Sequence, residues 1–174
     1  MSTLHVENLK GLSSGGNANK IIVPSGQTLL AGGHVVQVAQ YTSATTTTNS
    51  TTSVVQAMET GTFTLKNSSN KVLVTVNCLT RAVRSNASGV RLAIYRGAVA
   101  DASSVKITSG SEPQVYTQDS GAEQYSINTL QFLDTPSAST TTYSLGFWRH
   151  SSSGNVDIYG SFFNTTIILQ EVAV

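Results

Sequence analysis

Every second residue from Val72 to Cys78 is a small apolar side chain. A period of two is the period of a β-strand, so Val72, Val74, Val76 and Cys78 are expected to share one face of that strand. A strand with one apolar face needs partner strands and a second layer to cover it, which constrains the fold more than any other feature here. Cys78, a small hydrophobe on that face, is predicted to lie in the core.

Further segments with strand character follow at close spacing. In the segment 90–97 we expect Val90, Leu92 and Ile94 to point inward, and Arg91 and Arg96 to reach toward water. The final segment ends the chain and is apolar enough to favour a place inside a sheet, because an exposed edge of that composition would aggregate. The predicted strands are 34–41, 71–79, 90–97, 105–107, 114–116, 125–134, 141–148, 156–160 and 165–174.

Two details of the early chain are less regular. Within 34–41 the alternation places Val36, Val38 and Tyr41 near one face. The Thr-, Ser- and Asn-rich run at 42–53 then interrupts the pattern, and we interpret it as a loop or as a solvated strand edge.

Composition agrees with the strand pattern. About a quarter of the chain is serine or threonine, and only 11% is charged. These residues favour strands and turns over helices, and no segment has a convincing amphipathic helical period. The sequence therefore predicts an all-β fold, an antiparallel β-sandwich of the jelly-roll type with an extended N-terminal arm.

The predicted domain organisation is an arm at 1–33 and a β-sandwich at 34–174. The arm has two short apolar runs separated by Gly-, Ser- and Asn-rich turns, which is too little apolar surface to form its own core. Another subunit, another protein or the main domain must cover its apolar residues, which we predict to be the attachment and assembly residues. They are Leu4, Val6, Leu9, Ile21, Ile22 and Val23.

Charge and residue counts argue against several functional classes. The net charge is +1 with no basic cluster, so no nucleic-acid partner is predicted. No apolar run reaches the length of a membrane span and the first residues lack signal-peptide order, so no membrane insertion is predicted. One cysteine and three histidines give neither a disulfide nor metal-ligand spacing, and no metal or cofactor is expected.

No catalytic constellation is visible, so the chain is not expected to be an enzyme. The scattered acids form no motif and are interpreted as solvated loop residues; they include Asp101, Glu112, Asp119, Glu123, Asp134 and Asp157. One aromatic-plus-basic cluster, Trp148, Arg149 and His150, gives candidate surface-binding residues. The alternative is that Trp148 packs at the rim of the sandwich with its N–H bonded locally.

Several short phrases resemble small virion proteins and tail-fibre modules of tailed bacteriophages, particularly marine and cyanobacterial phages. They are the opening 2–9, the segment 18–29, the segment 33–38 with the Thr-rich run after it, Asp134-Thr135-Pro136, and the ending 169–172. The resemblance implies a jelly-roll head that forms a homotrimer and is attached to the particle by its N-terminal segment. It also implies other virion proteins as partners and a location in the virion, assembled in the host cytoplasm.

Four functions remain open from the sequence. The first is a short tail fibre or appendage that contributes to attachment to a host-surface glycan or protein. The second is a capsid decoration (cement) protein that stabilises the shell, which the lack of a long repeat stalk keeps open. A carbohydrate-active enzyme that uses two of the scattered acids is the third, although no such site is visible. A lectin is the fourth.

Overall fold

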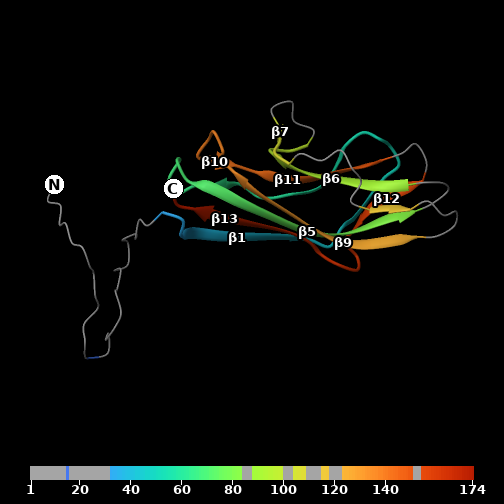
Figure 1. The fold of residues 1–174 in the computed structure, drawn as a ribbon, viewed down its shortest axis with the longest axis horizontal. Helices are drawn as coiled ribbons and strands as arrows, with labels where there is room; N and C mark the ends of the chain where they lie inside the picture. The colour runs from blue at the N-terminus through green and yellow to red at the C-terminus, as the bar shows by residue number, and fades with distance from the viewer. Residues whose placement is uncertain are drawn as a thin grey trace. The chain divides into compact units, whose positions relative to one another are not determined.

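Two antiparallel β-sheets pack face to face, and β5 (Lys71–Val83) is the central strand of the first (Figure 1). On one side β5 pairs with β9, and on the other it pairs with β13 and β12, which follow one another along the same edge. The strands β1 and β2 likewise follow one another along the outer edge of this sheet, where β1 pairs with β13 and β2 pairs with β12. We call two such consecutive strands an interrupted row. The bounds are β9 (Gln124–Asp134), β13 (Thr165–Val172), β12 (Asn155–Tyr159), β1 (Val35–Ser43) and β2 (Thr46–Asn49).

The second sheet runs from β3 through β11 and β6 to an outer row made of two short strands, β7 and β8. A separate two-stranded pair, β4 with β10, lies apart from both sheets in the pairing order. The bounds are β3 (Val55–Glu59), β11 (Tyr143–Arg149), β6 (Ser88–Arg96), β7 (Val105–Lys106), β8 (Val115–Thr117), β4 (Phe63–Thr64) and β10 (Thr140–Thr141).

The strand order is that of a jelly roll. When each interrupted row is counted as one strand and the β4–β10 pair is set aside, the described residues give eight strands, in the order 1-8-3-6 in the first sheet and 2-7-4-5 in the second. All the pairings are antiparallel. This double-sheet arrangement of two Greek keys confirms the predicted fold class.

The computed structural model describes the chain in blocks: residue 15 and residues 32–83, 88–99, 104–108, 115–117, 123–150 and 154–174. From Gly32 to Val174 the blocks belong to one unit. Every regular element within them is a β-strand, and none holds a helix that could cross a membrane. Residues of two predictions lie outside the described blocks: Leu4, Val6, Leu9, Ile21, Ile22 and Val23 of the arm, and the acids Asp101, Glu112 and Asp119.

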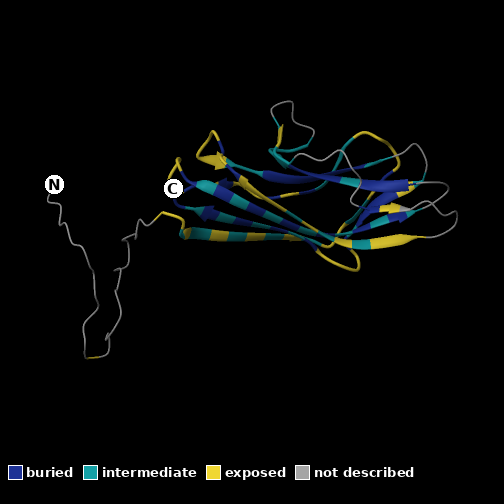
Figure 2. Cartoon of the chain, in the orientation of Figure 1, coloured by how far each residue is buried: buried dark blue, intermediate teal, exposed yellow. Residues whose placement is uncertain are grey.

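The core lies between the two sheets and is built by alternation along the strands. Val72, Val74, Val76 and Cys78 of β5 are all 0% exposed, as predicted. The alternation of buried and half-buried residues along β5 shows as dark blue and teal bands in Figure 2. Burial raises the pKa of the Cys78 thiol to about 12, so the side chain behaves as a small apolar group. The predicted final strand, β13, lies between β1 and β5, which confirms its place inside the sheet.

The early strands differ from the sequence prediction. The register of β1 shifts between Val35 and Gln37, so the alternation changes phase there, and Val38 is 59% exposed instead of facing the core with Tyr41. The run at 42–53 contains β2, an outer-row strand, so the interpretation as a solvated strand edge is correct for that part. The strand β3 was not predicted.

A buried ion pair ties the two sheets together at one end. Asp134 of β9 is 2% exposed and accepts hydrogen bonds from Arg96 Nε at 2.8 Å and from the Tyr143 hydroxyl at 2.8 Å, and it also pairs with Arg96 Nη2. Burial and the Asp134 charge raise the pKa of Tyr143, which therefore stays a proton donor. The prediction that Asp134 is a solvated loop residue was wrong, because it is buried and paired with Arg96. Arg96 was predicted to reach toward water; its side chain is 21% exposed, and its guanidinium turns to Asp134.

Glu171 of β13 is a second buried carboxylate. N–H groups, and not a cationic side chain, stabilise its charge. It is 0% exposed. It accepts hydrogen bonds from Gln37 Nε2 at 2.6 Å, from the backbone N–H groups of Lys66 at 2.9 Å and Asn67 at 3.1 Å, and from Asn70 Nδ2 at 2.7 Å. Burial alone would raise the pKa of Glu171, but these four donors together lower it. The carboxylate thereby fixes the turn at 66–70 against β13.

Candidate functional site

The outer face of the first sheet carries two apolar regions separated by a polar band. In the band, Thr129 donates a hydrogen bond to Asn77 Oδ1 at 2.7 Å, and Gln131 Nε2 donates one to the Thr75 hydroxyl at 3.1 Å. The region near the start of β1 is named the entry patch and is defined by its apolar members Val35, Val38, Leu73, Leu133 and Val172; Gln170 lies between Val38 and Leu73 on the same face. The region at the other end is built around Leu79, Tyr125, Ile127, Tyr159 and Phe162.

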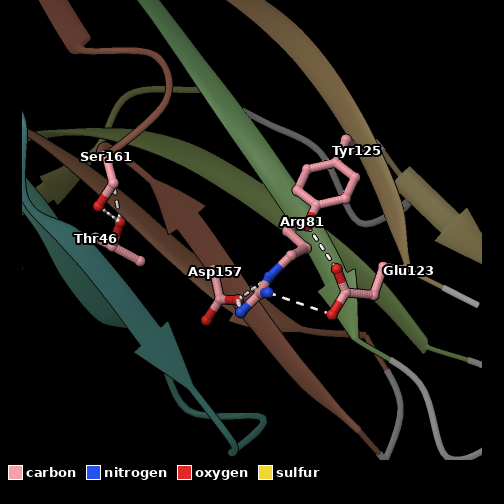
Figure 3. Close-up of polar contacts among 6 residues, drawn as sticks. All are labelled: Thr46, Arg81, Glu123, Tyr125, Asp157 and Ser161. Atoms are coloured by element: carbon pink, nitrogen blue, oxygen red, sulfur yellow. Dashed lines mark hydrogen bonds and ion pairs between the residues drawn. The ribbon is translucent and has the colours of Figure 1, made fainter.

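A five-residue excursion, 160–164, separates β12 from β13 and projects beside the second region. Its first residue is Gly160, where a Cβ atom would lie 2.3 Å from the carbonyl oxygen of Thr45. Only glycine allows this close approach of the two backbones. The next residue, Ser161, is held by Thr46, whose hydroxyl lies 2.9 Å from the Ser161 hydroxyl and accepts from its backbone N–H at 3.2 Å (Figure 3).

The excursion and three strands together line a pocket of about 320 Å³. We call it the aromatic cleft and define it by Leu79 of β5, Tyr125 of β9, Tyr159 of β12 and Phe162 of the excursion. The Tyr159 and Phe162 rings are stacked, with centroids 5.2 Å apart and an interplanar angle of 16°, and the Tyr125 ring lies 5.9 Å from Tyr159. Phe162 is 79% exposed and Tyr125 is 46% exposed, so the rings present open surface to solvent.

A charged network borders the cleft, centred on Arg81 of β5 (Figure 3). Arg81 Nε and Nη2 each lie 2.6 Å from Asp157 Oδ2, and Nη1 lies 3.3 Å from Glu123 Oε1. The Tyr125 hydroxyl donates a hydrogen bond to Glu123 Oε2 at 2.5 Å. The guanidinium carbon lies 4.7 Å from the centroid of the Tyr159 ring, so the network also supports the aromatic side chains.

The electrostatics keep this network charged. Burial alone would lower the pKa of Arg81, but hydrogen bonds to Asp157 and Tyr125 and the nearby carboxylates raise it overall. The hydrogen bond to Glu123 raises the pKa of Tyr125. Two carboxylates and one guanidinium leave one net negative charge beside the cleft among the described residues. Asp157 is fully buried, and its Oδ1 has no hydrogen-bond partner in that part of the chain.

This arrangement suits reversible binding. The rings offer a flat apolar surface, and the exposed Glu123 carboxylate offers lone pairs for hydrogen bonds at its edge. In the described blocks no group of three or more His, Cys, Asp or Glu side chains could hold a metal ion.

The structure places the predicted surface-binding residues elsewhere, at the end of β11. Trp148 is 9% exposed, and Lys106 Nζ lies 4.9 Å from its ring centroid. The Arg149 guanidinium donates to a backbone carbonyl at 2.5 Å, and the His150 ring packs edge-on against Tyr116 with centroids 5.6 Å apart. In this chain Trp148 offers no open ring face, and the binding role of the three residues stays a prediction.

The residues of the aromatic cleft were not predicted as a site. Glu123 is exposed, in line with the prediction for the acids, but Asp157 is fully buried against Arg81, so that part of the prediction was wrong. One signal was available in the sequence. Phe162 and Phe163 are adjacent aromatic residues between the turn-forming residues Gly160-Ser161 and Asn164, where a solvated turn ordinarily carries polar side chains.

The strand order defines the class: an eight-stranded jelly-roll domain with an exposed aromatic cleft on one sheet. No protein-family model matches the sequence, and no curated protein matches it. Among solved structures, the chain is similar to a protein chain in the structure of the Gx strain of infectious bursal disease virus. The TM-score is 0.40 and the sequence identity is 9%, over 80% of this chain and 39% of that chain.

A second similar structure is the VP2 subviral particle of infectious bursal disease virus, with a TM-score of 0.41 and 10% identity over 80% of this chain and 38% of that one. A chain in the structure of the Gt strain of the same virus is similar with a TM-score of 0.36 and 10% identity, over 99% of this chain and 47% of that chain. The chain therefore spans less than half the length of these proteins.

Proposed function

We propose that this chain is a structural protein of a virus particle and that its aromatic cleft attaches the particle to a host surface. The observation that carries the proposal is the open stack of Tyr159 and Phe162, which lies on the outer face of a jelly roll, beside charged groups. Jelly rolls serve both as viral capsid proteins and as lectins. The resemblance of the sequence to phage virion proteins supports the particle as its location.

The proposed assembly is a homotrimer that residues 1–33 connect to other virion proteins. The entry patch supports a subunit contact, because Val38 is 59% exposed and Leu133 is 47% exposed on one sheet face. Exposed apolar side chains gathered in this way are typical of surfaces that other protein subunits cover. The chain enters the domain beside this patch, where the Gly33 N–H donates to the carbonyl oxygen of Ala173 at 2.8 Å.

Labelling of intact particles with an antibody against the full chain tests the location. Label confined to a tail or appendage supports attachment, whereas label over the whole shell would replace it with capsid decoration. Absence of the protein from purified particles would refute a virion function altogether. Light scattering of the full chain and of a chain lacking residues 1–33 tests the assembly, since a monomer in both cases would contradict the homotrimer.

We also propose that the cleft binds without catalysis. Glu123 and Asp157, the acids that the described residues place beside the cleft, are both engaged by the Arg81 guanidinium, and Asp157 is fully buried. Glycoside hydrolysis needs one carboxyl group as an acid and a second as a nucleophile or base on either side of the bond. Incubation of the full chain with polysaccharides should release no reducing ends, and steady release that disappears in Glu123→Gln would contradict this.

A further inference from the structure

Phe162 is the outermost ring of the aromatic cleft and the group a ligand meets first. It is 79% exposed, yet its ring is fixed by stacking on Tyr159 at 5.2 Å. Tyr159 is itself held by the Arg81 guanidinium 4.7 Å from its centroid. A large apolar ring that is both exposed and supported from behind is pre-organised for stacking, so a ligand that lies on it causes little further loss of conformational freedom.

The edge of the cleft supplies hydrogen-bonding groups that are only partly used. Glu123 accepts one hydrogen bond at each carboxylate oxygen, from Arg81 and from the Tyr125 hydroxyl, although a carboxylate has about four acceptor positions. Its side chain is 45% exposed. A ligand that lies in the cleft and extends past Tyr125 with hydroxyl groups at its own edge would meet these acceptors, because the Tyr125 hydroxyl is bonded to Glu123, whereas a purely apolar ligand would leave them unused.

The charge beside the cleft and the volume of the cleft limit the class of ligand further. The two carboxylates and one guanidinium of the network leave one net negative charge, which repels an anionic ligand. The volume of about 320 Å³ lies at the lower end of the range for small-molecule sites. A pyranose ring has one face of C–H bonds and a rim of hydroxyl groups, so an uncharged sugar ring matches both parts of the site.

We propose that the aromatic cleft binds a neutral pyranose of a host-surface glycan, with the C–H face of the sugar on Phe162 and its hydroxyl groups toward Glu123. This inference rests on the proposed function, because it names the ligand class of the attachment site. An apolar side chain of another protein could also contact Phe162. The experiment below distinguishes such a protein ligand from a sugar.

The test is calorimetric titration of the full chain with three neutral hexasaccharides, maltohexaose, cellohexaose and chitohexaose, and with anionic hexagalacturonate. We expect at least one neutral sugar to bind and hexagalacturonate to bind at least tenfold more weakly than it. Phe162→Ala and Phe162→Leu should each weaken binding of that sugar by at least about tenfold, because both remove the ring. Phe162→Tyr should retain it.

Phe163→Ala is the matched control, since Phe163 is on the same excursion but does not line the aromatic cleft. It should bind as the unchanged chain does, and thermal unfolding should show that all four variants are folded. Failure of all three neutral sugars to bind overturns the proposal, as does stronger binding of hexagalacturonate. Unchanged binding by Phe162→Leu overturns stacking in favour of a general apolar contact.

The proposal and the proposed function fail separately. If the sugar binds through Phe162 but the protein is absent from purified particles, the ligand class stands and the virion function is wrong. If the protein is present on particles but no neutral sugar binds, the virion function stands and the ligand class is wrong.

Discussion

Replacement of Glu171 by glutamine, which preserves the shape of the side chain, should destabilise the fold. The carboxylate receives four N–H donors, from Gln37, Lys66, Asn67 and Asn70. A glutamine side chain keeps one oxygen but turns an NH₂ group toward the remaining donors, which leaves one or two of them unpaired. Each hydrogen bond to a buried charge contributes about 1.5–3 kcal/mol, so Glu171→Gln should cost about 2–4 kcal/mol.

The assay is thermal unfolding near neutral pH, at one fixed protein concentration. A loss of about 2–4 kcal/mol corresponds to a fall in Tm of roughly 5–15 °C for a chain of this length. The matched control is Glu59→Gln, an exposed glutamate on β3, which should change Tm by less than about 2 °C. If Glu171→Gln unfolds within about 2 °C of the unchanged chain, the inference that the carboxylate holds the 66–70 turn is refuted.

The pH dependence gives a second readout. Because folding lowers the pKa of Glu171, its stabilisation is fully present above the unfolded pKa of about 4.3 and is lost as the pH falls through the folded pKa. Glutamine does not titrate. The difference in unfolding free energy between the two proteins should therefore be constant near neutrality and shrink in acid, and a difference that grows in acid would contradict the sign of the shift.

Three further experiments, one thiol-reactivity assay and two substitutions, test other parts of the fold. Cys78 should not react with a thiol reagent until denaturant is added, because burial raises its pKa to about 12, and rapid reaction of the folded chain would contradict its place in the core. Asp134→Ala should cost about 3–5 kcal/mol in urea unfolding, since it leaves Arg96 and Tyr143 without their buried acceptor, and a cost below about 1 kcal/mol would show that the ion pair is not structural. Gly160→Ala should weaken sugar binding and lower Tm, because its Cβ would lie 2.3 Å from a backbone oxygen; unchanged values for both would show that the excursion does not depend on that close approach.

The fold class could be predicted because its strongest signals are local. The period of two in β5 and the apolar final strand depend only on neighbouring residues, and both are placed as expected. The position of Val38 could not be predicted, because the bulge between Val35 and Gln37 arises from pairing with β13, far along the chain. A shift of one residue in register moves side chains to the other face, and the sequence pattern does not contain that information.

The aromatic cleft could not be predicted from the sequence because it too depends on how distant strands pair. Arg81 and Tyr125 lie directly opposite each other only because β5 and β9 pair in a particular register, and Tyr159 joins them through the pairing of β12 with β5. Their separation along the chain gives no local pattern. The adjacent pair Phe162-Phe163 in a turn context was the one local sign of the site.

The position of the 160–164 excursion has a consequence for how such a protein can change. The row that it interrupts is fixed on both sides, by β12 pairing with Thr80–Val83 and by β13 pairing with Lys71–Asn77. Insertions and substitutions at 162–164, beyond the glycine that the close approach to Thr45 requires, leave those registers, and hence the alternation of buried side chains, as they are. Ligand preference can therefore diversify through a few codons while the core sequence stays under its own, separate selection.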